Sequence, residues 1–211
     1  MQTWPAPAPP DVPGRGLPVR LFDTSAKRVL PLAPGDPARM YVCGITPYDT
    51  THLGHAFTFA AFDIIIRYLE SMGHRVRYVQ NVTDIDDDIL RQAGEEGEDW
   101  LALGDRWTAH YIQDMQALNV RPPDFFPRAT DYVSGMVETV QELIAAGVAY
   151  ESGGNVYFHI DSWPRFGELS RIPRDEMLAI ANERGNFPDD PNKRDPLDFV
   201  LWQAQAPGEP S

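Results

Sequence analysis

Two histidines three positions apart, His52 and His55, begin an apolar segment with helical spacing. Such a pair can be polar residues on an exposed helix face, two metal ligands, or groups that contact a bound anion. Gly54 lies between them and would let a ligand approach the backbone. The free N–H groups at a helix start and the helix dipole both favour phosphate. The position therefore predicts a phosphate site.

Cys43 is the only cysteine of the chain and directly follows the apolar run over 39–42. A lone thiol at the end of a buried strand is either a ligand or a small core residue, and spacing alone favours the core residue. One cysteine cannot form an internal disulfide, so nothing in the chain calls for an oxidising compartment.

The elements that position these residues form a strand, a loop, a helix and a second strand. In chain order, the sequence predicts a buried strand over 39–42, a turn-rich loop over 44–51, a helix over 53–69 with Gly73 at its C-cap, and a strand over 76–82. A strand, a helix and a parallel strand make a βαβ unit, the opening of a Rossmann-like sheet. Ligands of such sheets bind beyond the carboxyl ends of the strands, where Cys43 and Thr83 fall.

The rest of the chain indicates further helices and a small hairpin. The predicted elements are paired short strands over 17–22 and 29–32, helices over 89–93, 100–118, 132–146 and 177–184, and strands over 148–151 and 155–160 joined by Gly153-Gly154. The acidic residues at 84–88 lack the glycine and the terminal glutamate of a calcium loop. We expect at least one of them to cap the helix that follows.

Four regions are predicted along the chain. They are a proline-rich arm over 1–17 anchored by Trp4, a Rossmann-like half-domain over 18–125, an inserted α+β subdomain over 126–196, and a return to the catalytic core over 197–211.

Composition narrows the class of protein. The chain has 211 residues and a formal net charge of −13, and no apolar run approaches the ~20 residues of a membrane span. With no basic-then-apolar leader at the start, a cytoplasmic protein is expected. A surface that binds a nucleic-acid backbone usually carries a basic patch, which this sequence lacks. The charge therefore favours a small molecule over a nucleic acid as the binding partner.

Two blocks carry a family resemblance: residues 43–55, with CGITPYD and HLGH, and residues 78–87, YVQNVTDIDD. They resemble the signatures of the cysteine-activating branch of class I aminoacyl-tRNA synthetases. Two families share these blocks: cysteinyl-tRNA synthetase, and the ligase that joins cysteine to glucosaminyl-inositol in mycothiol synthesis. Ile45, Pro47 and Leu53 differ from the more usual synthetase residues, and the opening over 1–16 also resembles the ligase. The resemblance therefore favours the ligase.

The resemblance implies roles for particular residues. Cys43 would be a zinc ligand that lets the metal bind the substrate thiol, and His52 and His55 would stabilise charge on the α-phosphate of ATP. The residues expected to surround cysteinyl adenylate are Gly44, Ile45, Thr46, Gly54, Thr58, Asn81, Val82 and Thr83.

The resemblance also implies a reaction: cysteine and ATP, the latter with Mg²⁺, would give cysteinyl-AMP, and the cysteinyl group would pass to the amine of glucosaminyl-inositol. The alternatives are transfer to tRNA by a cysteinyl-tRNA synthetase, and a non-catalytic nucleotide-binding module. A second metal-ligand segment and a K-M-S-K-S loop, expected in these families, do not occur in the sequence. We therefore expect an N-terminal part that is inactive alone and binds zinc weakly or not at all.

Overall fold

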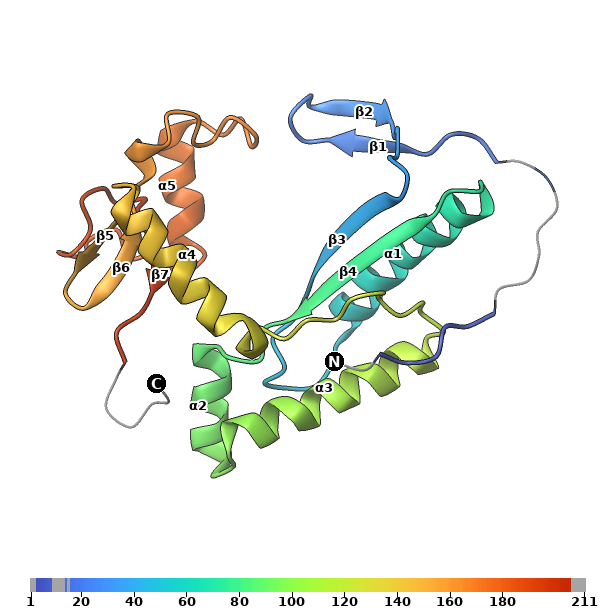
Figure 1. Cartoon of the computed structure of the whole chain (residues 1–211), viewed down its shortest axis with the longest axis horizontal. Coiled ribbons are helices and arrows are strands. Elements are labelled where there is room, and N and C mark those ends of the chain that lie inside the picture. The colour runs from blue at the N-terminus through green and yellow to red at the C-terminus, as the bar shows by residue number, and fades with distance from the viewer. Residues whose placement is uncertain (1–2, 9–13, 15, 206–211) are drawn as a thin grey trace. The chain divides into compact units, whose positions relative to one another are not determined.

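The computed structural model describes residues 3–8, 14 and 16–205 (Figure 1). The described residues separate into two compact units. The first takes in Met1–Leu21 and Pro31–Tyr132, and the second Phe22–Leu30 and Val133–Ser211, in each case as far as they are described.

The first unit contains the βαβ arrangement. β3 (Ala38–Ile45) pairs in parallel with β4 (Val76–Val82), and α1 (Leu53–Ser71) connects the two strands. Figure 1 shows β3 and β4 side by side with α1 running alongside them. The prediction of an α/β, Rossmann-like fold with a parallel sheet is confirmed in this unit.

β3 is longer than the sequence predicted. The expected strand ended before Cys43, whereas pairing continues to Ile45, whose carbonyl accepts a hydrogen bond from Thr83 N–H at 2.8 Å. The register between the strands is irregular between Val42 and Ile45. At the end of α1 the C-cap is Met72, and Gly73 follows it with a φ of +87°.

Two helices cover one face of this sheet. Side chains of α1 and of α3 (Trp100–Ala117) pack into the same core as the inward side chains of the strands. The buried members are Trp4, Val42, Ile45, Phe59, Ile66, Tyr78, Val82, Tyr111, Met115, Val120 and Phe126. Tyr41 and Cys43 alternate with Met40 and Val42 along β3, so they lie on the opposite face, where both are exposed.

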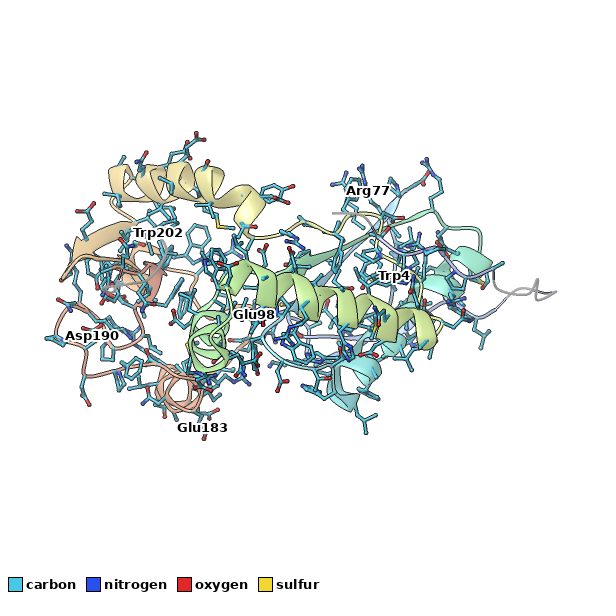
Figure 2. All side chains as sticks on the ribbon, turned by 90° about the horizontal axis from the view of Figure 1, so that it is seen from below. Trp4, Arg77, Glu98, Glu183, Asp190 and Trp202 are labelled. Carbon is cyan, nitrogen blue, oxygen red and sulfur yellow. The ribbon has the colours of Figure 1, made fainter. Side chains whose placement is uncertain are left out.

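Trp4 fixes the N-terminal arm to this core, as predicted. Its indole Nε1 donates to the carbonyl of Val120 at 2.8 Å, and its ring makes edge contacts with Tyr111 and Phe126. Figure 2 labels it. The described part of the arm therefore belongs to the first unit.

α2 (Asp87–Glu96) bears out the prediction of a carboxylate cap. Asp86 is its N-cap, and its side chain accepts a hydrogen bond from Asp88 N–H at 3.1 Å. Gly97 closes the helix in the left-handed conformation. Asp84 is instead buried, where it accepts two hydrogen bonds from Thr130.

The second unit is built on a three-stranded antiparallel sheet. Its order is β5-β6-β7, and Gly153 and Gly154, both with positive φ, make the predicted hairpin between β5 and β6. The elements are α4 (Val133–Ala145), β5 (Ala149–Ser152), β6 (Asn155–Phe158), α5 (Arg174–Asn182) and β7 (Phe199–Trp202). A separate hairpin pairs β1 (Arg20–Asp23) with β2 (Arg28–Pro31), as predicted for the early strands.

Two segments of the second unit differ from expectation. The strand predicted over 155–160 ends at Phe158, because the chain turns into a short 3-10 helix over Ile160–Ser162. The segment from 197 was expected to return to the catalytic core, but β7 pairs with β6, and Phe199 stacks on Phe158 with ring centroids 5.0 Å apart. The final residues, 206–211, lie outside the described part.

Among the described residues, no helix has the length and apolar character that crossing a membrane requires.

Candidate functional site

The two histidines form the N-terminal cap of α1. His52 is the N-cap residue, and its Nδ1 accepts a hydrogen bond from Gly54 N–H at 3.0 Å. His55 reaches back, and its Nδ1 accepts from His52 N–H at 3.3 Å. The rings stack with centroids 3.9 Å apart and planes 22° apart. This is a capping box in which imidazoles take the place of the usual hydroxyl and carboxylate.

The cap changes the expectation that unpaired backbone N–H groups of the helix start would meet a phosphate. The N–H groups of His52 and Gly54 are used by the imidazoles, and those of His55 and Ala56 donate to the carbonyl of His52. The donors that the cap leaves at the helix start are therefore the N–H of Leu53 and the imidazole side chains. A phosphate at this end of α1 would be contacted mainly by imidazole nitrogens.

The same hydrogen bonds fix which nitrogen of each ring carries the proton. An Nδ1 that accepts from a backbone N–H cannot be protonated, so each neutral ring holds its proton on Nε2. Burial, and secondarily the neighbouring His52, lowers the pKa of His55 below its ordinary value. His55 therefore offers a neutral Nε2–H donor at neutral pH.

We expect an NMR titration of the imidazoles to show His55 with a pKa below 6.5 and its proton on Nε2. Because the folded pKa is lowered, the folded state binds fewer protons than the unfolded state near that pH. This contribution to stability is complete above pH 6.5 and decreases as the pH falls through the folded pKa. Long-range ¹H–¹⁵N spectra of the ring nitrogens test both statements, and a proton on Nδ1 at pH 8 would contradict the cap geometry.

Gly54 makes room for this arrangement. A Cβ atom at this position would lie 2.7 Å from Cε1 and 2.9 Å from Nδ1 of His52. The space opened by the glycine is thus occupied by the imidazole of His52, and not by a ligand as predicted from the sequence. Any larger residue would displace the ring from the helix start.

Asn81 links the two strands at their carboxyl ends. Its Oδ1 accepts from Tyr41 Oη at 2.8 Å and from Gly44 N–H at 2.9 Å, and its Nδ2 donates to Thr83 Oγ1 at 3.1 Å. The backbones are closest here, since a Cβ on Gly44 would lie 1.6 Å from the carbonyl oxygen of Asn81. Asn81 therefore sets the position of both Gly44 and Thr83.

The Asn81 contacts lead to a graded prediction. Tyr41→Phe removes one exposed hydrogen bond and is expected to cost about 0.5–1 kcal/mol of unfolding free energy. Asn81→Ala also leaves Gly44 N–H without its partner and should cost about 2–3 kcal/mol. Urea denaturation of the two variants tests the order, and equal costs would mean that the hydrogen bonds of Asn81 with Gly44 and Thr83 contribute nothing.

The other predicted site residues lie in different settings. Ile45 is buried in the core, Thr46 and Thr83 are half-buried, and Thr58 is exposed on α1. Val82 is fully buried, and its N–H and carbonyl are bonded to Pro127 and Ala129. Val82 therefore has a packing role and presents no free group, so it does not fit the expected contact with the adenylate.

Cys43 is a free, exposed thiol. Spacing alone favoured a core residue, and that prediction is wrong, because the alternation of side chains along β3 turns Cys43 outward together with Tyr41. No group of three potential ligands among His, Cys, Asp and Glu occurs in the described part of the chain. A zinc site needs at least three protein ligands, so the described residues do not build one around Cys43.

Two positioning contacts were not predicted from the sequence. Tyr41 reaches Asn81, and the signal for it was its place two residues before Cys43 on the same strand face. In the loop before α1, Thr50 Oγ1 lies 3.4 Å from Nε2 of His110 on α3. That contact joins residues 60 positions apart, and no local pattern could have shown it.

Comparisons with known proteins agree with the fold. Residues 31–211 match the family described as tRNA synthetases class I (C) catalytic domain. Among solved structures, methionyl-tRNA synthetase of Mycobacterium tuberculosis bound by methionyl-adenylate is similar with a TM-score of 0.52 at 20% identity. The similarity covers 70% of this chain and 35% of that chain, and it supports the fold.

Curated relatives are more similar in sequence. A protein of Mycolicibacterium smegmatis named L-cysteine:1D-myo-inositol 2-amino-2-deoxy-alpha-D-glucopyranoside ligase is 51% identical over all of this chain and 52% of its own length. Proteins of the same name from Frankia casuarinae and Thermomonospora curvata are 49% and 48% identical, with 46% and 52% of their lengths covered. The chain thus spans about half the length of these relatives.

Proposed function

Since the chain belongs to the family of class I (C) tRNA synthetase catalytic domains, we propose that it supplies the cysteine- and ATP-binding half of a ligase that activates L-cysteine as cysteinyl-AMP. The observation that carries the proposal is the paired histidine cap of α1 in the strand-loop-helix segment that also contains Cys43. Both features belong to the first unit.

In this proposal the histidines stabilise charge on ATP. The carboxylate of cysteine attacks the α-phosphate, pyrophosphate leaves, and negative charge increases on the phosphate oxygens in the transition state. His52 and His55 would donate their Nε2–H groups to those oxygens. Their Nδ1 atoms are already bonded to the backbone, so the donors are oriented before the substrate arrives.

The carboxyl ends of β3 and β4 would hold the aminoacyl part. Thr46 and Thr83 carry short hydroxyls suited to the amino group of cysteine, and Asn81 fixes Thr83 and Gly44 in place. The thiol of Cys43 would face the substrate side chain. Because the described residues lack a full set of zinc ligands, no step of this proposal depends on a metal.

The acceptor we propose is the amine of glucosaminyl-inositol. Support comes from the names of the relatives, which are 51% and 49% identical to this chain over the matched region. The formal charge of −13 also suits a small acceptor better than a nucleic acid. Transfer to tRNA is the alternative, and the family description, which names tRNA synthetases, supports it.

Binding of a non-hydrolysable sulfamoyl analogue of cysteinyl adenylate tests the first step. We expect isothermal titration calorimetry to show that the 211-residue chain binds this analogue and that His55→Ala weakens binding at least tenfold. The corresponding seryl analogue should bind the wild-type chain less tightly. Leu169→Ala, an exposed position of the second unit, is the matched control. Equal binding by wild type and His55→Ala would defeat the assignment of the histidines.

A non-catalytic nucleotide-binding module remains the second candidate, because the chain covers only about half of its relatives. Cysteine-dependent exchange of labelled pyrophosphate into ATP separates the two. Binding of the analogue without exchange, even when the remaining half of the relatives is supplied, would favour the module.

A further inference from the structure

A series of buried aromatic rings begins directly beside His55. Phe59 lies one turn further along α1, and its ring is nearly parallel to the His55 imidazole, with centroids 6.5 Å apart and planes 14° apart. Residues four positions apart share one face of a helix, so this contact follows from the helix itself. The half-buried imidazole thus has a ring neighbour on each side along α1, His52 before it and Phe59 after it.

Phe59 is in turn held by a ring of α3. Tyr111 meets Phe59 edge to face with ring centroids 5.3 Å apart, and Trp4 meets Tyr111 in the same way at 6.1 Å. Phe59, Tyr111 and Trp4 are 2%, 1% and 4% exposed. Edge-to-face pairs have a preferred geometry and close packing transmits displacements, so a shift of one ring moves its neighbour. The aromatic contacts therefore extend from the N-terminal arm to the site histidine.

Hydrogen bonds fix the two inner rings of this series. Trp4 Nε1 donates to the carbonyl of Val120 at 2.8 Å. Gln80 Nε2 donates to Tyr111 Oη at 2.6 Å, and Gln80 is itself 1% exposed. Both rings are therefore held by β4 and by the segment after α3, independently of α1.

The cap hydrogen bond by itself holds the His55 ring loosely. The 3.3 Å between His55 Nδ1 and His52 N is longer than the 2.7–3.2 Å usual for such bonds. Rotation of an imidazole about its outer side-chain torsion is also weakly restricted. Burial lowers the pKa of His55, in agreement with protein atoms covering part of the ring. The direction of its Nε2–H group therefore depends on packing against Phe59.

We propose that Phe59 is a positioning residue for His55, and that Tyr111 and Trp4 hold Phe59 in place. The N-terminal arm then contributes to the phosphate site without contacting the substrate. The inference rests on the proposed function, in which His55 donates Nε2–H to the α-phosphate of ATP. Without the Phe59 ring the imidazole would rotate, and its proton would be shared between Nδ1 and Nε2.

Phe59→Leu and its matched control Phe126→Leu separate positioning from core packing. Both rings belong to one core, are 2% and 3% exposed and contact Tyr111, but of the two it is Phe59 that stacks on His55. Long-range ¹H–¹⁵N spectra of the ligand-free chain should show one His55 tautomer in wild type and in Phe126→Leu. Phe59→Leu should show a mixture of tautomers and a His55 pKa raised towards 6.5. Identical His55 signals in the two variants would overturn the proposal.

Binding of the sulfamoyl analogue of cysteinyl adenylate gives a second measurement. Phe59→Leu should weaken it about fivefold, because a donor out of place loses its contact, and Phe126→Leu should stay within about twofold of wild type. Equal binding by both variants would also contradict the proposal. A wild-type chain that does not bind the analogue would reject the proposed function, and the ligand-free His55 spectra would still decide this inference. Phe59→Met, which fills more of the space without a ring, replaces Phe59→Leu if circular dichroism shows that variant unfolded.

Trp4→Leu tests the far end of the series. Its effect on the His55 signals should have the same direction as that of Phe59→Leu and be smaller, because Tyr111 lies between. Trp4→Phe keeps a ring at this position and should restore the wild-type signals. His55 signals in Trp4→Leu identical to those of Phe126→Leu would overturn the role of the arm.

Discussion

Gly44→Ala is expected to destabilise the first unit by about 3 kcal/mol or more, the upper range for overpacking a close contact. The added methyl group would lie 1.6 Å from the carbonyl oxygen of Asn81 and 2.7 Å from its carbonyl carbon. These are backbone atoms of β4, so no side-chain rotation can relieve the clash. The strands would have to separate at their carboxyl ends, and urea denaturation should show an earlier transition.

Gly94→Ala is the matched control. Gly94 lies inside α2, and a Cβ there would meet no atom within 4 Å. Alanine is the better helix former by about 1 kcal/mol, so this change should stabilise the chain slightly. Opposite signs for the same chemical change would show that the cost at Gly44 comes from contact with Asn81. A Gly44→Ala variant as stable as wild type would mean that the strands do not approach this closely.

Local patterns were sufficient for the βαβ unit. The apolar run before Cys43, the helical spacing from Leu53 and the second apolar run up to Val82 each predict one element without help from distant residues. Glycines predicted turns and carboxylates predicted a helix cap from the local sequence alone, because a left-handed φ and a capping oxygen are both local requirements. The Gly153-Gly154 hairpin was therefore predicted, and so was a carboxylate cap from the acidic residues at 84–88, a position that Asp86 takes.

The details that depend on tertiary contact were not predictable. Periodicity placed a helix start at His52, but only the folded chain shows that both imidazoles turn back to accept backbone N–H groups. The apolar neighbours of Cys43 by themselves favoured a core residue, whereas the strand alternation exposes the thiol. The place of β7 beside β6 depends on pairing between residues more than forty positions apart, which no local pattern encodes.

Acid should destabilise the second unit through Asp198. This carboxylate is fully buried and accepts hydrogen bonds from Tyr150 Oη at 2.7 Å, Ile160 N–H at 2.9 Å and Asp195 N–H at 3.1 Å. His159 Nδ1 lies 3.4 Å away. Burial by itself would raise the pKa of Asp198, but the hydrogen bonds together lower it below the ordinary 3.8. The network connects β5, the turn after β6 and the segment that leads into β7.

Because the folded pKa is lowered, this contribution to stability is fully present above about pH 4 and is lost as the pH falls through the folded pKa. Asp198→Ala should cost about 3–5 kcal/mol at pH 7, since two buried donors and one half-buried donor lose their acceptor. Asp198→Asn keeps one acceptor oxygen, so it should cost less and remove most of the loss in acid. The control is Asp161→Asn, an exposed carboxylate 3.5 Å from Arg174, where about 1 kcal/mol or less is expected. Amide NMR signals of β5 and β6, followed against urea at several pH values, report the unfolding of this unit alone. If Asp198→Asn lost stability in acid as the wild type does, another carboxylate would be responsible.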